Sequence, residues 1–81
     1  MSILFKIIIM QKKELYKIIG KNIQVERKKQ GLTQESFAEL MKVSWSYVSK
    51  IESGVLNLSI GKILEISNYL NIEVDKLLQI K

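Results

Sequence analysis

The chain has 81 residues, no cysteine, no histidine and a formal net charge of +5. This length suits one small domain, and the missing residue types exclude disulfides, thiolate metal sites and the commonest general base. The charge is unevenly distributed along the chain. Residues 1–50 hold ten Lys/Arg and four Asp/Glu, whereas residues 51–81 hold three Lys/Arg and four Asp/Glu. A basic half indicates a surface for a polyanion, although a solvated lysine-rich surface would give the same composition.

Residues 1–11 form an apolar extension that is rich in β-branched residues up to Met10. The run is too short to span a bilayer, which takes about 20 apolar residues, and it lacks the basic start of a signal peptide. We therefore expect no membrane association and a cytoplasmic location. Two interpretations stay open for residues 1–10. They are a strand that pairs with its copy across a dimer, or a disordered start that precedes a natural initiator at Met10.

Residues 12–81 predict a single all-α domain of five helices. In the first helix, which starts at Lys12, Leu15, Ile19 and Ile23 line one face, and Gly31 follows its end as a C-cap. Thr33 can cap the second helix. Its inward residues are predicted to be Phe37, Ala38 and Met41.

The third helix can be capped by Ser44 and ended by Gly54, with Val48 and Ile51 facing inward. Ser59 can cap the fourth helix. Its inward residues are predicted to be Ile60, Ile63, Leu64, Ile66 or Ser67, and Leu70. Asn71 can then adopt a left-handed conformation. A last turn of helix at 74–78 supplies two more core residues, Leu77 and Leu78.

Residues 33–54 have the pattern of two short helices joined by a tight turn, with a second helix that presents Lys50 and other polar side chains. This is the layout of a helix-turn-helix DNA reader. Lys50 can donate to guanine or to phosphate, and Gln34 lies at a helix N-terminus, which favours phosphate. Trp45 is open to two interpretations. It either packs on thymine methyl groups or sugars, or is buried in a dimer or against the preceding helix.

Residues 16–78 resemble the Cro/phage-repressor (Xre-like) helix-turn-helix family through the run 31–35, Ala38 and the run 48–54. The resemblance implies a compact five-helix, lambda-repressor-like domain that binds double-stranded operator DNA as a homodimer without a cofactor, a metal or a small-molecule ligand. It also implies groove contacts from the third helix and phosphate contacts from Gln34 and the following loop. The candidate DNA-binding residues are Thr33, Gln34, Ser44, Trp45, Ser46, Tyr47, Ser49, Lys50, Ser53 and Asn57.

The family often pairs an arginine of the first helix with the glutamate that ends the third, here Arg27 and Glu52. Arg27 is the only arginine among the thirteen basic residues. A forked guanidinium suits a partly buried carboxylate better than an ammonium does, which independently favours a structural ion pair. The alternative is a surface arginine near phosphate.

The chain departs from the family pattern in two places. Lys42 stands in the inter-helix turn where glycine is common, so a left-handed lysine would be strained by about 1 kcal/mol, unless the turn differs slightly. The loop 55–58 is apolar for a DNA-facing segment, so Leu56 and Leu58 are candidates for packing under the fourth helix instead.

These observations predict a sequence-specific transcriptional regulator, similar to controller proteins or Cro, that binds a pseudo-palindromic operator as a homodimer. The alternative is an antitoxin or another interaction module of the same fold whose main partner is a protein. An enzyme is not expected, because the common nucleophile–base pairings need histidine or cysteine.

Overall fold

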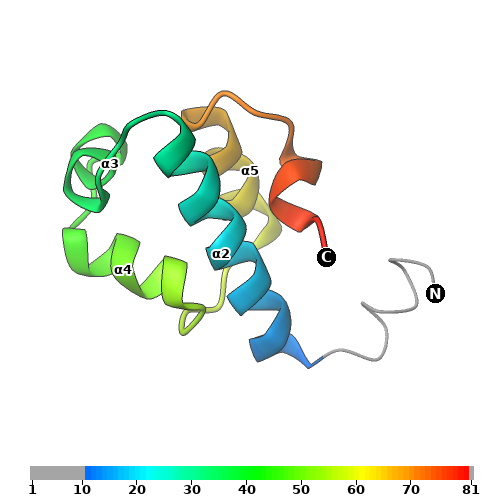
Figure 1. Ribbon diagram of the computed structural model, residues 1–81. Coiled ribbons are helices and arrows are strands. Elements are labelled where there is room, and N and C mark those ends of the chain that lie inside the picture. Colours follow the sequence, from blue (N-terminus) through cyan, green and yellow to red (C-terminus); the bar gives the residue numbers. More distant parts are fainter. Residues whose placement is uncertain (1–10, 81) are drawn as a thin grey trace.

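The computed structural model describes residues 11–80 and is all-α throughout that range, as predicted. Its α-helices are α2 (Lys12–Lys29), α3 (Gln34–Met41), α4 (Trp45–Ser53) and α5 (Ile60–Tyr69) (Figure 1). The last predicted turn of helix is a 3₁₀-helix, η1 (Val74–Leu78). Among these helices none combines the length and the apolar character needed to cross a bilayer. The two interpretations of residues 1–10 lie outside the described residues.

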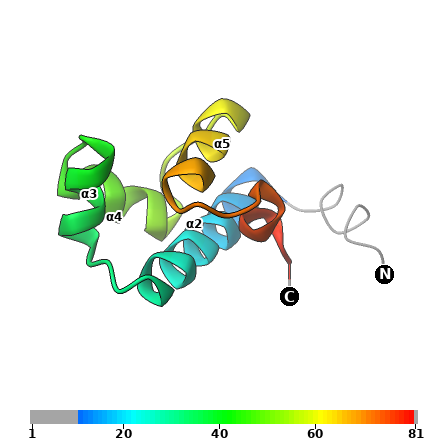
Figure 2. The same cartoon turned by 90° about the horizontal axis from the view of Figure 1, so that it is seen from above.

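Helix α2 is the central element of the fold. It packs against α4 and η1, while α3 packs on α4 and α5 packs on η1. Figures 1 and 2 show α3 and α4 together on the side of α2 that is away from η1. This arrangement leaves the outer surface of the α3–α4 pair free of other described elements.

Local capping residues set the helix starts that the sequence predicts. The Thr33 hydroxyl accepts from the Ser36 N–H at 3.0 Å, and the Ser36 hydroxyl accepts from the Thr33 N–H at 2.9 Å, which is a reciprocal capping box. Ser59 likewise accepts from the Lys62 N–H at 3.0 Å. At the helix ends, Lys42 and Asn71 adopt left-handed φ values of 59° and 55°. The predicted strain at Lys42 is therefore present.

One apolar core joins all five elements. Its fully packed members are Ile19, Ile23, Phe37, Ala38, Met41, Val48, Ile51, Leu58, Ile63, Ile66, Leu70 and Leu77. Leu15 and Leu56 are partly buried against it. The inward faces predicted for α2, α3 and α4 are thus confirmed, and Leu58 packs in the core rather than facing outward from its loop.

Three residues that the sequence places inside are exposed. Ile60 is 85% exposed, Leu64 is 48% exposed and Leu78 is 38% exposed. The buried stripe of α5 contains Ile63 and Ile66 and continues through Ser67 and Leu70. Ile60 and Leu64 are rotated away from the centre of that stripe at 100° per residue. The sequence supplied more apolar residues than one face of a ten-residue helix can bury.

Candidate nucleic-acid interface

Helix α4 presents a polar outer face above an apolar inner one. The Ser44 hydroxyl caps it by accepting from the Tyr47 N–H at 3.0 Å. Val48 and Ile51 are buried, whereas Ser46, Ser49 and Lys50 are exposed. Because residues three and four apart share a helical face, this division follows directly from the sequence spacing. A helix of this kind can lie in a major groove while its inner face stays packed.

A buried ion pair fixes the end of α4 to α2. Arg27 Nε donates to Glu52 Oε2 at 2.7 Å, and Arg27 Nη2 donates to Glu52 Oε1 at 2.9 Å. The two side chains are only 5% and 3% exposed. Arg27 Nη1 also donates to the Leu32 carbonyl at 2.7 Å, so the guanidinium also reaches the loop before α3. Such bidentate, charge-assisted bonds hold both groups in fixed orientations.

The ion pair extends to the surface through two further hydrogen bonds. Gln34 Nε2 donates to Glu52 Oε1 at 3.1 Å, and Trp45 Nε1 donates to Gln34 Oε1 at 2.9 Å. The indole at the start of α4 is therefore connected through the start of α3 to the buried pair. The Trp45 side chain is nevertheless 59% exposed. Within residues 11–80, the Trp45 side chain is therefore not buried against α3. Its indole nevertheless cannot rotate without breaking the hydrogen bond to Gln34.

A hollow of about 400 Å³ lies on this outer surface. It is lined by Gln34, Trp45, Ser46, Ser49 and Lys50. An ammonium, two hydroxyls, an amide and an indole suit the edges of base pairs and phosphate oxygens. They do not form a nucleophile–base pair, and within residues 11–80 no cluster of acidic side chains could hold a metal ion.

The model of the helix-turn-helix family HTH_3 matches residues 23–77, which include α3, α4 and both members of the ion pair. The chain belongs to this family. Helices α3 and α4, joined by a tight turn, form the helix-turn-helix pair within the matched residues, and α4 is the second helix of that pair. No curated protein sequence matches the chain significantly.

Solved structures of regulators share the HTH_3 fold of this chain. The restriction-modification controller protein C.AhdI from Aeromonas hydrophila superposes with a TM-score of 0.75 at 31% identity, over 84% of this chain and 99% of that protein. The clp gene regulator ClgR from C. glutamicum superposes with a TM-score of 0.73 at 26% identity, over 79% and 83%. A hypothetical transcription factor, NHTF from Neisseria, has the same fold at 23% identity and a TM-score of 0.75, over 86% and 80%.

The remaining candidate residues are distributed around the helix-turn-helix pair and are not gathered at the hollow. The hydroxyls of Thr33 and Ser44 already accept capping bonds. The Ser53 hydroxyl donates to the Lys50 carbonyl at 3.1 Å. Tyr47 is half-buried against the core, and Asn57 is exposed in the loop after α4. Thr33 and Ser44 thus cap the two helices, Tyr47 and Ser53 belong to α4, and Asn57 follows it.

Gly20 is not among the residues predicted to matter, although the packing of α4 on α2 depends on it. A Cβ at Gly20 would lie 2.6 Å from the Glu52 carbonyl oxygen and closer still to that of Ile51. Only glycine therefore lets α4 approach α2 this closely. The sequence does contain a signal for this contact, an isolated glycine inside a helical pattern. Because such a glycine lowers helix stability, it usually marks a close packing contact.

Proposed function

We propose that this helix-turn-helix protein is a sequence-specific transcriptional regulator that binds a pseudo-palindromic operator as a homodimer. The outer face of α4 is the main support for this function. There Ser46, Ser49 and Lys50 line a hollow, beside the indole of Trp45 that is hydrogen-bonded to Gln34. Polar side chains on a groove-sized helix are what base-edge readout requires. Gln34 and Thr33, at the start of α3, are proposed to flank a phosphate.

Charge and relatives support the same function. Neutralising phosphates with lysine releases counterions, and the chain carries its excess of cations in residues 1–50, which contain α2, α3 and most of α4. The similarity to C.AhdI extends over nearly all of that protein, which favours a controller-like regulator over a Cro-like one. In this proposal the regulator acts through its concentration and its dimerisation.

Selection of bound duplexes from a random library tests the proposal. We expect enrichment of one sequence with two half-sites of opposite orientation about one helical turn, roughly 34 Å, apart. Binding that never distinguishes selected from random DNA would contradict sequence-specific recognition. That result would favour the alternative, an interaction module whose main partner is a protein.

Replacement of Lys50 by methionine is expected to weaken binding to the selected duplex. If Lys50 donates to guanine, the loss is about 1–3 kcal/mol and preference at one base pair relaxes. If it contacts only phosphate, binding weakens equally for all sequences and the salt slope shrinks by about one. Titrations of variant and wild type at several salt concentrations separate the two results. Unchanged affinity and slope would remove Lys50 from the interface.

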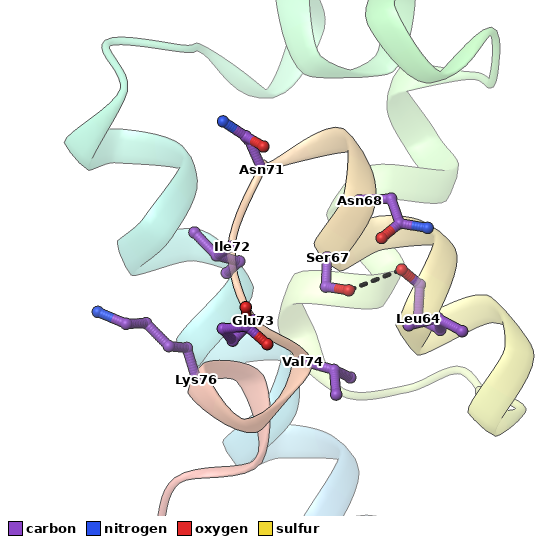
Figure 3. A pocket seen from close by; sticks show the side chains of 8 residues that line it. All are labelled: Leu64, Ser67, Asn68, Asn71, Ile72, Glu73, Val74 and Lys76. Atoms are coloured by element: carbon purple, nitrogen blue, oxygen red, sulfur yellow. Dashed lines mark hydrogen bonds between the residues drawn. The ribbon is translucent and has the colours of Figure 1, made fainter.

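The exposed apolar residues near the start of α5 are proposed as the homodimer contact. Val55 is 67% exposed, and Ile60 and Leu64 lie about one turn apart on α5. Beside Leu64, a hollow of about 620 Å³ lies between α5 and η1, and most of the residues that line it are polar or charged (Figure 3). In a two-fold dimer the same patch contacts itself, so Ile60 and Leu64 of one copy can pack against the same residues of the other beside this hollow.

Replacement of Leu64 by glutamate is expected to raise the dimer dissociation constant about 100-fold or more, because each copy would bury an unpaired carboxylate. Sedimentation velocity over a concentration series measures this. Leu40→Glu is the matched control, because Leu40 is 47% exposed on α3 and lies outside the proposed contact. A Leu64→Glu protein that dimerises like wild type would contradict the contact on α5. Residues 1–10 would then be tested with a chain that starts at Met10.

A further inference from the structure

Trp45 is the first residue of α4 and the single tryptophan of the chain. Isolated exposed apolar residues are common on protein surfaces, so its 59% exposure alone decides nothing. Its one polar group, however, is already engaged. The indole has only the Nε1–H donor, and that donor bonds Gln34 Oε1 at 2.9 Å. The part of Trp45 left for a ligand is therefore its carbon surface.

The orientation of this carbon surface is set before any DNA arrives. Gln34 is held at its other end by Glu52, whose carboxylate is bonded twice to Arg27. A side chain fixed in its bound orientation loses less entropy on association than a free one. Gln34 thus acts as a positioning residue that aims the indole.

The major groove offers one apolar group to such a surface. Base edges present donors and acceptors, and the exception is the methyl group on C5 of thymine. Methylated cytosine carries the same group on the same ring atom. Ser46, Ser49 and Lys50 line the hollow next to the indole and supply the polar contacts.

We propose that Trp45 is a specificity-determining residue that reads a pyrimidine 5-methyl group, positioned by its bond to Gln34. This inference rests on the proposed function, since it names what one residue of that interface recognises. Burial of one methyl group corresponds to about a fourfold change in affinity, or roughly fifteen-fold for two half-sites.

The test uses the duplex enriched by selection, prepared in three forms. One form is unmodified, one has deoxyuridine in place of thymidine, and one has 5-methylcytosine in place of cytosine. If the 5-methyl group that Trp45 contacts belongs to thymine, we expect the wild-type protein to bind the uracil form about fifteen-fold more weakly than the unmodified form. If Trp45 instead faces cytosine, binding to the methylcytosine form is stronger by a similar factor.

Three variants assign the effect to the indole. Trp45→Ala is expected to abolish the discrimination. Gln34→Ala is expected to reduce the discrimination between the three forms. It should also lower the fluorescence anisotropy of the single tryptophan in the free protein, because the indole would lose the hydrogen bond that holds it. Ser46→Ala is the control, which weakens binding to all forms but keeps their ratio.

Equal affinity of wild type for all three forms would overturn the proposal, as would discrimination that survives Trp45→Ala. A selection that enriches no sequence would overturn the proposed function, and this inference with it.

Discussion

Replacement of Arg27 by methionine is expected to lower the free energy of unfolding by about 3–5 kcal/mol, because it leaves the Glu52 carboxylate buried without its partner. The same change removes the bond from Arg27 Nη1 to the Leu32 carbonyl, which holds the loop before α3. For a chain of this length the loss is a large part of the total stability. Urea unfolding followed by circular dichroism measures it.

Lys62→Met provides the control, since Lys62 and Glu65 form a pair at 3.1 Å whose side chains are 35% and 51% exposed, and such surface pairs contribute little. The double variant Arg27→Met/Glu52→Met is expected to recover much of the lost stability, because an apolar pair of similar volume removes the uncompensated charge. An Arg27→Met protein with full stability and reduced DNA affinity would show that the arginine serves DNA rather than the fold.

Replacement of Gly54 by alanine is the second large expected effect, a loss of about 2–5 kcal/mol. Gly54 ends α4 at a φ of +78°, and a left-handed L-residue costs about 1–2 kcal/mol. In addition, a Cβ there would lie 2.6 Å from the Lys17 Cα and 2.7 Å from the Lys17 nitrogen on α2. Because these are backbone atoms, relief requires the helices to separate, at about 1–3 kcal/mol.

Gly31→Ala separates the two contributions to this loss. Gly31 has nearly the same φ, +73°, but a Cβ there meets nothing within 4 Å. Its replacement should cost only the conformational part, about 1–2 kcal/mol. Thermal and urea unfolding of both variants give the comparison. Equal losses in the two proteins would contradict the close approach of Gly54 to α2.

The parts of the fold that depend on local sequence could be predicted. Thr33, Ser44 and Ser59 cap helices because a side-chain oxygen there reaches a backbone N–H a few residues ahead, whatever the tertiary context. Glycine at 54 and asparagine at 71 adopt the expected left-handed turns for the same local reason. The inward faces of α2, α3 and α4 followed from helical periodicity.

The parts that depend on how helices meet could not be predicted in the same way. The apolar residues of α5 extend over more than one helical face, and the position of the neighbouring elements decides that Ile63 and Ile66 are covered. Ile60 and Leu64 stay exposed. The bond from Trp45 to Gln34 joins two helices, so spacing alone left the orientation of the indole open. The requirement for glycine at position 20 likewise becomes visible only from the close contact between α2 and α4.

Sequence-specific DNA binding by the outer face of α4 can be measured by fluorescence anisotropy. The titration compares DNA from upstream of the protein's own gene with a random duplex of equal length, at two salt concentrations. We predict saturable binding to the upstream DNA that the random duplex does not match, with affinity for both falling steeply as salt rises. Equal, weak binding to both duplexes, or affinity that does not change with salt, would contradict the account.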